Sequence, residues 1–330
     1  MLAPGFRQAP VLYIVNSYDH NSFEWTKNVM DGIVQGLANG GLNKGVDYQM
    51  VVETMDVFGH TTPEQTRLQA DRILADIRAR RPDLVFTIDD DALSLVGLAL
   101  DDLPVVFNGV NGDPRRYLSS AKIDSIERPG HNLTGVYQTT YFRQSLLLIK
   151  KLVPSAGTFA TITDTTTTGK ALLESLKAVD SVSLPLRWID SLESDRFSQW
   201  KEKIKAWQSR VDVVFLLSAN AVTDHLGNRM TMKQVIEWTA ANSALPDTAC
   251  WTEQVRNGIL VSATDDGAQQ GRFSAALALK ILQGAKPGEL PISTPPNGLL
   301  ALNLRRANRL GIFPPQELMS MLIENGVIFK

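Results

Sequence analysis

Three consecutive aspartates, Asp89, Asp90 and Asp91, directly follow the apolar run Leu84–Ile88. A carboxylate at this place could accept hydrogen bonds from the ammonium or hydroxyl group of a ligand. The same residues could instead cap the helix that follows and complement its dipole, because acids are favoured in a first helical turn. Both roles remain open, and different members of the triplet could serve each.

A loop rich in aromatic and polar residues, 17–25, follows the apolar run Val11–Asn16. In an open α/β sheet, the loop at the carboxyl end of the first strand faces the crevice where ligands bind. We therefore expect this loop to form the first wall of a small-molecule site. The candidate ligand contacts in it are Ser17, Tyr18, Asp19, His20, Phe23 and Trp25.

Further candidates follow the other predicted strands. Asn108 begins the turn 108–113, although Asn and Gly are common in any turn. Tyr137 could stack on a ligand while its hydroxyl finds a partner. Trp251 is a natural second aromatic wall, whereas Trp188, Trp200, Trp207 and Trp238 are expected to pack in the core. The remaining candidate ligand contacts are Thr139, Asp164, Thr165, Ser218, Asn220, Glu253 and Asp265.

The segment 164–168, an aspartate followed by four threonines, precedes a predicted helix. Threonine hydroxyls and backbone N–H groups there could clamp a carboxylate, or they could simply cap the helix. The segment is not a phosphate loop, since Asp164 occupies the place of the leading glycine. Ala171 also replaces the Ser or Thr that would bind magnesium. We therefore exclude nucleotide hydrolysis.

Signatures of catalysis are weak throughout the chain. No Gly-x-Gly-x-x-Gly follows a strand, and no Gly-x-Ser-x-Gly occurs. The four histidines lack metal-ligand spacing, and Cys250 is the single cysteine. We expect no catalytic residue, metal or cofactor. A cleft hydrolase or isomerase using Asp89 or Glu253 as base is a remote alternative.

The composition is that of an ordinary globular protein, with 44% hydrophobic and 21% charged residues among 330. A formal net charge of -2 and the absence of basic runs argue against nucleic-acid binding. No apolar stretch reaches the roughly 18 residues of a membrane span. We expect a soluble monomer. Residues 1–10 lack the apolar core of a signal peptide, so the protein is cytosolic or an export segment has been removed.

Strands and helices alternate along the chain, which predicts mainly parallel sheets covered by helices. The first series contains strands 11–16, 48–54, 84–88 and 103–107 and helices 26–38, 65–80 and 92–100. The second contains helices 142–152, 169–179, 197–207 and 229–242 and strands 158–163, 186–189, 211–217 and 248–251. Two such series predict two doubly wound, Rossmann-like lobes with a ligand cleft between them.

The last part of the chain is too short for its own core. We expect its strands 259–263 and 299–304 and its helix 268–282 to add to sheets already built. The chain would then cross between the lobes more than once and form a hinge. The expected lobes are 1–137 plus about 264–290, and 138–263 plus about 291–330.

Three segments are distinctive enough to point to a family. They read NLTGV at 132–136 followed by QSLLLIKKLVP at 144–154, ALKILQGAKPGELP at 278–291, and NLRRANRLGI at 303–312. With these segments the chain resembles the extracytoplasmic solute-binding proteins of ABC transporters. The resemblance is to the type I periplasmic-binding fold, in the group that includes aromatic-amino-acid binders.

The resemblance implies two hinged lobes that close on a small polar or aromatic solute and deliver it to an ABC permease. It also implies a periplasmic or extracytoplasmic location, with the export signal removed. The family usually has a small polar run where this chain has 137–140, and small residues where it has 251–253. The identity of the ligand is therefore not carried over. A subset of relatives that serve as sensors has a similar opening to Asn16, Ser17 and Tyr18 with Trp25. The alternative function is therefore the ligand-sensing domain of a membrane signalling protein of the histidine kinase or cyclase type.

Overall fold

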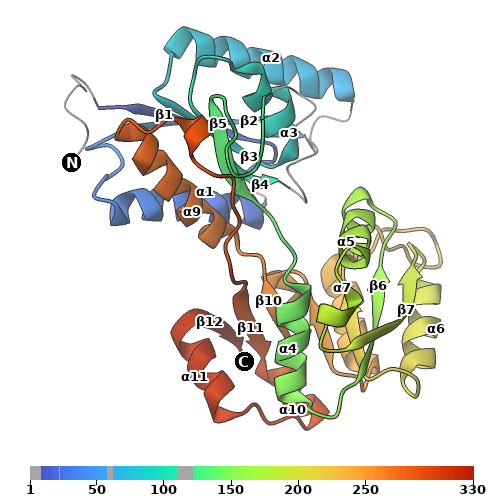
Figure 1. The fold of residues 1–330 in the computed structure, drawn as a ribbon. Coiled ribbons are helices and arrows are strands. Elements are labelled where there is room, and N and C mark those ends of the chain that lie inside the picture. The colour runs from blue at the N-terminus through green and yellow to red at the C-terminus, as the bar shows by residue number, and fades with distance from the viewer. Residues whose placement is uncertain (1–8, 22, 58–61, 111–121) are drawn as a thin grey trace. The chain divides into compact units, whose positions relative to one another are not determined.

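The computed structural model describes residues 9–21, 23–57, 62–110 and 122–330. The chain divides into two compact units (Figure 1). Unit 1 consists of Met1–Thr139 and Asp266–Pro296, and unit 2 of Thr140–Asp265 and Asn297–Lys330. The chain therefore passes from one unit to the other three times, after Thr139, Asp265 and Pro296.

Unit 1 is built on a five-stranded parallel sheet with the strand order β2-β1-β3-β4-β5. Every residue of β3 and β4 is buried, as expected for central parallel strands covered on both faces. The strands are β1 (Val11–Asn16), β2 (Gln49–Thr54), β3 (Leu84–Ile88), β4 (Val105–Val110) and β5 (Leu133–Tyr137).

Helices cover both faces of this sheet. Helices α1 (Glu24–Asn39) and α9 (Gly267–Leu282) share a core with Leu12, Ile14 and Phe86. Helices α2 (Pro63–Arg80) and α3 (Asp90–Leu95) pack on the opposite face. Short 3-10 turns, η1 (Gly97–Ala99) and η4 (Pro287–Glu289), complete the unit.

Helices α1 and α9 come from distant parts of the sequence and lie in close contact. A Cβ atom on Gly271 of α9 would lie 2.1 Å from the carbonyl oxygen of Val29 in α1. Any side chain at position 271 would therefore push the helices apart. The contact joins the segment after the second crossing to the first helix of the chain.

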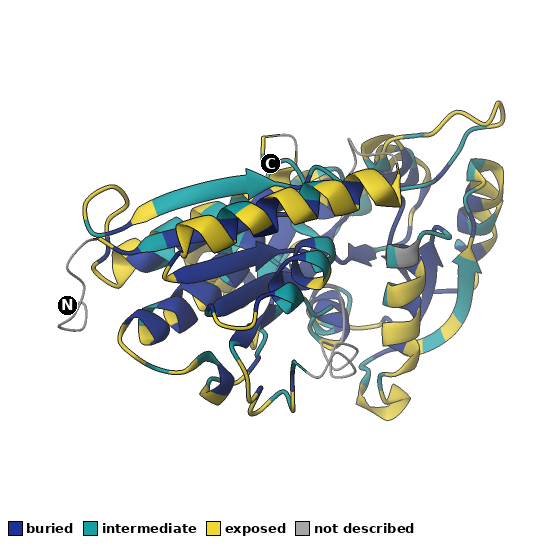
Figure 2. Cartoon of the chain, turned by 90° about the horizontal axis from the view of Figure 1, so that it is seen from above, coloured by how far each residue is buried: buried dark blue, intermediate teal, exposed yellow. Residues whose placement is uncertain are grey.

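Unit 2 contains a four-stranded parallel sheet with the order β7-β6-β8-β9. Its strands are β6 (Thr158–Thr163), β7 (Arg187–Glu193), β8 (Val213–Leu216) and β9 (Asp247–Ala249). Its helices are α4 (Phe142–Leu152), α5 (Thr167–Lys177), α6 (Phe197–Trp207), α7 (Met232–Asn242) and α8 (Thr252–Arg256), with a 3-10 turn η3 (Ser181–Ser183). Strands β6, β8 and β9 are almost wholly buried, the edge strand β7 is partly exposed, and the helices expose their outer faces (Figure 2). The expected α/β class is confirmed.

The four tryptophans assigned to packing do lie in the cores of unit 2. Trp200 and Trp207 are fully buried on α6. Trp188 and Trp238 are partly buried and pack against two different clusters of apolar side chains. Their expected structural role is confirmed.

The expectation that strands near 259–263 and 299–304 extend existing sheets is wrong. Strands β10 (Val261–Thr264) and β11 (Leu299–Asn303) pair antiparallel with each other, and β11 pairs parallel with β12 (Gly326–Phe329). They form a separate three-stranded sheet with α10 (Leu304–Leu310) and α11 (Gln316–Asn325) beside it. A separate core is not needed, because Val261, Leu302 and Leu322 bury their side chains in the same cluster as Phe159 and Phe215 of the parallel sheet.

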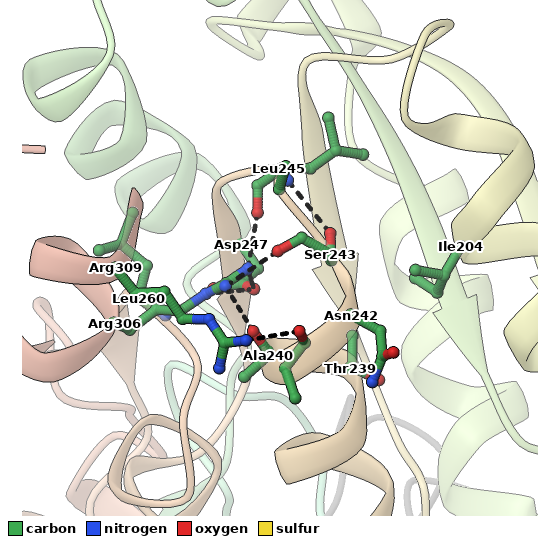
Figure 3. A network of polar contacts seen from close by, with 12 residues as sticks. Ile204, Thr239, Ala240, Asn242, Ser243, Leu245, Asp247, Leu260, Arg306 and Arg309 are labelled. Carbon is green, nitrogen blue, oxygen red and sulfur yellow. Dashed lines mark hydrogen bonds and ion pairs between the residues drawn. The ribbon is translucent and has the colours of Figure 1, made fainter. Parts of the chain in front are cut away.

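A buried ion pair joins α10, beside this three-stranded sheet, to Asp247 at the start of β9 (Figure 3). The guanidinium of Arg306 donates to both carboxylate oxygens of Asp247, the shortest contact being 2.6 Å. It also donates to the carbonyl oxygens of Ala240, Ser243 and Leu245 at 2.7–3.0 Å. Arg306 belongs to the segment 303–312 that carried part of the family resemblance, and its role there is structural.

Candidate functional site

The strand order of unit 1 reverses direction between β1 and β3, because β2 lies on one side of β1 and β3 on the other. Loops leaving such a point diverge, which opens a crevice at the carboxyl ends of the strands. Backbone hydrogen bonds hold the loops together beneath it. Ser17 N donates to Ile88 O at 3.1 Å, and Asp89 N donates to Asn108 O at 2.9 Å.

Asp89 is the central side chain at this edge. Its side chain is 4% exposed, and it begins α3 without capping the helix, so the capping alternative does not hold for this residue. Its backbone has φ 70° and ψ 172°, a conformation almost confined to glycine. Burial, with a smaller contribution from the nearby Asp91 carboxylate, raises the pKa of Asp89 to about 8. Strain and a displaced pKa together are typical of functional positions.

Several buried polar atoms around Asp89 have no hydrogen-bond partner among the described residues. They are Oδ1 of Asn16, Oδ2 of Asp89, and both Oδ1 and Nδ2 of Asn108. Buried polar groups in native proteins are nearly always paired. Four unpaired atoms from the ends of three adjacent strands therefore indicate a place where a polar ligand or water completes the bonding.

Aromatic side chains border these polar atoms. The rings of Tyr18 and Phe23 pack at 4.9 Å between centroids. Burial raises the pKa of the Tyr18 hydroxyl, and the carboxylates of Asp89 and Asp91 raise it further. The hydroxyl is therefore neutral, and it lies close enough to the two aspartates to feel their charge.

Trp25, in the first turn of α1, also lies close to Asp89. Its buried indole N–H is close enough to the carboxyl group to lower the pKa of Asp89, without the geometry of a full hydrogen bond. Both groups lie against Gly109, where the pairing of β4 with β5 shifts register. Gly109 has φ 66°. This β-bulge brings the backbone close to the two side chains.

The other polar candidates of the first loop make hydrogen bonds or close contacts within the loop or to neighbouring elements. The hydroxyl of Ser17 donates to Ile88 O and accepts from Ala92 N, both at 2.9 Å. Asp19 accepts from the backbone and side-chain nitrogens of Asn21. His20 Nδ1 lies 3.5 Å from Nδ2 of Asn16. These residues shape the loop, and Ser17 in particular ties it to α3.

Unit 2 repeats the strand reversal between β6 and β8, and Asp164 occupies its carboxyl edge. This fully buried carboxylate accepts from Thr166 N and Oγ1, from Ser218 Oγ, and from the backbone nitrogens of Asn220 and Ala221. Both oxygens are occupied by the chain itself. Asp164 therefore holds two loops together.

Thr165 is also engaged within unit 2. Its backbone nitrogen and hydroxyl both donate to the carboxylate of Asp195. The neighbouring Thr166 caps α5 by accepting from Gly169 N at 3.0 Å. The capping role proposed as one alternative for this segment is therefore present.

The remaining candidates lie at chain crossings or at the end of β9. Tyr137 ends β5, and its carbonyl oxygen accepts from Nε2 of Gln270 at 3.0 Å. Thr139 and Asp265 are the last residues before two of the three crossings. Trp251 is partly buried against the unit 2 core and bridges to Asp265, and Glu253 is exposed in the first turn of α8.

Some candidate residues lie within the acidic triplet or beyond the described chain. Asp90 and Asp91 form the first turn of α3, and burial raises the pKa of Asp91. Residues 111–113 of the expected turn after Asn108, and residues 1–8, lie outside the described residues.

Asn16 was missed as a candidate. Its position as the last residue of β1 was the available signal.

The described residues contain no group of three or more His, Cys, Asp or Glu side chains placed to hold a metal ion. Within the same part of the chain, no helix is both long and apolar enough to cross a membrane. The chemistry available at the unit 1 edge is therefore that of carboxyl, amide, phenol and indole groups.

Comparison with known proteins identifies a family. The family model described as "ABC transporter substrate binding protein" matches residues 19–324. A curated relative, the tyrosine-binding protein of Clostridioides difficile strain R20291, is 21% identical over 281 residues, which cover 84% of this chain and 73% of the relative.

Two solved structures share the fold over almost the whole chain. One is the ligand-free, open structure of a substrate-binding protein with adhesive properties from Clostridium difficile, with a TM-score of 0.77 and 18% identity, covering 97% of this chain and 99% of the other. The second is an ABC domain in complex with L-Trp from Streptococcus pneumonia, with a TM-score of 0.64 and 20% identity, covering 98% and 100%.

Proposed function

This chain belongs to the ABC transporter substrate binding protein family, and we propose that it captures an amino-acid-like solute with an aromatic ring at the carboxyl edge of the unit 1 sheet. The family assignment confirms the resemblance seen in the sequence, and the fold is that of the type I periplasmic binding proteins. Members of this family are extracytoplasmic and bind solutes for an ABC permease.

The observation that carries the proposed site is the set of unpaired buried atoms of Asn16, Asp89 and Asn108 beside the rings of Tyr18 and Trp25. Ligand pockets are mostly apolar with a few converging polar groups, and this edge has both. The aromatic side chains match a flat apolar group, and the amide and carboxyl groups match a polar head. The tyrosine- and tryptophan-binding relatives support the same class of solute.

We propose that unit 2 closes the site as a second wall, with Trp251, Asn220 and Glu253 as its contributions. Three chain crossings would act as the hinge, and a closed state would be stabilised by contacts that it alone makes with the solute. The protein would act as a monomer without catalysis and without binding nucleic acid, and would deliver its solute to the permease.

Calorimetry with aromatic amino acids tests this proposal. Tyr18→Ala and Trp251→Ala should each weaken binding of L-tyrosine or L-tryptophan by about tenfold, since each loses a large aromatic contact. Phe313→Ala is the matched control, because Phe313 is an 85% exposed aromatic residue that should leave affinity unchanged. If neither amino acid raised the melting temperature or gave binding heat, the proposed solute class would be rejected.

A further inference from the structure

Three of the buried aspartates, Asp89, Asp164 and Asp247, have very different surroundings. Asp247 faces the guanidinium of Arg306 at 2.6 Å and accepts from Leu260 N (Figure 3). Asp164 accepts five hydrogen bonds from its own unit. Asp89 is 4% exposed and, among the described residues, has neither a cation beside it nor a donor to its Oδ2. Within the described part of the chain, the carboxyl group of Asp89 therefore lacks the cation or full set of donors that stabilises Asp247 and Asp164.

The groups facing Asp89 come from every neighbouring element. The first loop provides the neutral phenol of Tyr18, α1 the indole of Trp25, and α3 the carboxyl group of Asp91. The bulge of β4 provides Asn108 and Gly109, which carry no charge. Among the residues that the structure describes, the surroundings of Asp89 are thus neutral or negative and contain no positive charge.

We propose that Asp89 binds the protonated amine of the solute and loses its own proton as the amine arrives, so that each binding event releases one proton. This inference rests on the proposed function and specifies how the same site recognises its ligand. The balance is simple. A carboxylic acid and an ammonium ion become a carboxylate–ammonium pair, and the acidic proton passes to solvent.

Physical chemistry favours an amine over a hydroxyl at this position. A hydroxyl can hydrogen-bond to a neutral carboxyl group, but it cannot offset the cost of a buried negative charge. An ammonium ion offsets that charge directly, and the aromatic faces of Tyr18 and Trp25 can add cation–π attraction. Because burial raises the pKa of Asp89 to about 8, the ligand-free protein holds a protonated carboxyl group here at neutral pH. An adjacent ammonium would lower that pKa and release the proton.

Calorimetry on the full chain tests the proton balance. Binding of L-tyrosine and L-tryptophan is measured at pH 6.5 in buffers with different ionisation enthalpies, which counts the protons released. We expect about one proton per solute, and an affinity that rises up to about tenfold per pH unit below pH 8. The sign follows from mass action, since a reaction that releases a proton is favoured at lower proton concentration.

Analogues identify the group that is recognised. The deaminated acids 3-(4-hydroxyphenyl)propanoate and indole-3-propanoate should bind at least about 30-fold more weakly than the amino acids, because the buried charge loses its partner. Tyramine and tryptamine, which keep the amine and lack the carboxylate, should still release a proton on binding.

A variant pair locates the effect. Asp89→Asn should weaken binding of L-tyrosine or L-tryptophan by roughly 30-fold or more and abolish proton release. Asp71→Asn removes a 53% exposed carboxylate on α2 and should change neither quantity. If Asp89→Asn failed to fold, the buffer comparison and the analogue series on the unaltered protein would still decide.

The outcomes separate this inference from the proposed function. Tight binding of L-tyrosine or L-tryptophan without proton release, or equal binding of the deaminated acids, would overturn the role of Asp89 and leave the proposed function standing. Binding of none of the six compounds would overturn both.

Discussion

Gly109 lies directly against the indole of Trp25. A Cβ atom at position 109 would be 3.1 Å from Nε1 of Trp25 and 3.2 Å from Oδ1 of Asp89. Gly109 also has φ 66°. Glycine is therefore required here for two reasons: it adopts this left-handed backbone without strain, and it leaves room for the side chains of Trp25 and Asp89.

Gly109→Ala should therefore reduce stability and solute binding together. The left-handed backbone costs about 1–2 kcal/mol for a residue with a Cβ, and the methyl group displaces Trp25 or Asp89. Urea unfolding and calorimetry measure the two effects. Gly41→Ala is the control, because Gly41 has φ 88° and a Cβ atom there would meet no other described atom within 4 Å. Gly41→Ala should lower stability and leave solute binding unchanged. If Gly109→Ala also left binding unchanged, the contact of Gly109 with Trp25 and Asp89 would not contribute to the binding site.

Asp89→Gly should make the protein more stable and at the same time abolish tight binding. The change relieves a backbone conformation that costs on the order of 1–3 kcal/mol, offset by about 0.5–1 kcal/mol for the flexibility of glycine in the unfolded chain. We expect a net gain of about 1 kcal/mol in the free energy of unfolding at neutral pH, measured with urea. A loss of stability would show that the Asp89 side chain supports the fold.

The free energy of unfolding of the ligand-free protein should fall as pH rises from about 4 to 8. The pKa of Asp89 is raised to about 8 in the folded state from 3.8, so in this range the folded state holds a proton that the unfolded state has lost. The stabilisation is complete below pH 4 and disappears as pH passes 8. Asp89→Asn lacks this titration, and its stability relative to the unaltered protein should increase by a few kcal/mol across the range. Parallel pH curves for the two proteins would contradict the prediction.

Arg306→Met should lower the free energy of unfolding by about 3–5 kcal/mol, because Asp247 would be left buried without its cation and three carbonyl oxygens would lose their donor. Urea unfolding measures the loss. Arg305→Met is the matched control on the same helix. Arg305 is exposed and donates to the terminal Lys330 O, so its change should stay within about 0.5 kcal/mol.

The regular elements of the fold were largely predictable from the sequence. The bounds expected for β3, α4, β6 and α6 are those of the structure, because an apolar run marks each strand and an apolar face marks each helix. The terminal region was harder. Helix α11 exposes the apolar Met321 and Ile323, which blurs its periodicity, and β12 is only partly buried along its whole length. A strand without an inside and an outside face gives no alternating pattern.

The candidate site could be predicted from the sequence only in part. The sequence placed polar residues at the ends of strands, but it could not show which of their atoms the chain itself uses. The side chains of Ser17 and Asp164 form hydrogen bonds with other residues of the chain. Both amide atoms of Asn108, in contrast, have no partner among the described residues. A loop has no period from which side-chain direction can be read, so only the three-dimensional arrangement separates these cases.

The late position of α9 in the chain bears on how the protein is made. The strands of unit 1 are complete at Tyr137, but α9, which buries Leu12, Ile14 and Phe86 together with α1, ends only at Leu282. A growing chain therefore carries an apolar sheet face covered by α1 without α9 while residues 140–265 of unit 2 are synthesised. The core on that face is completed only when this late helix is made, so apolar side chains there stay open to chaperones until synthesis is almost finished.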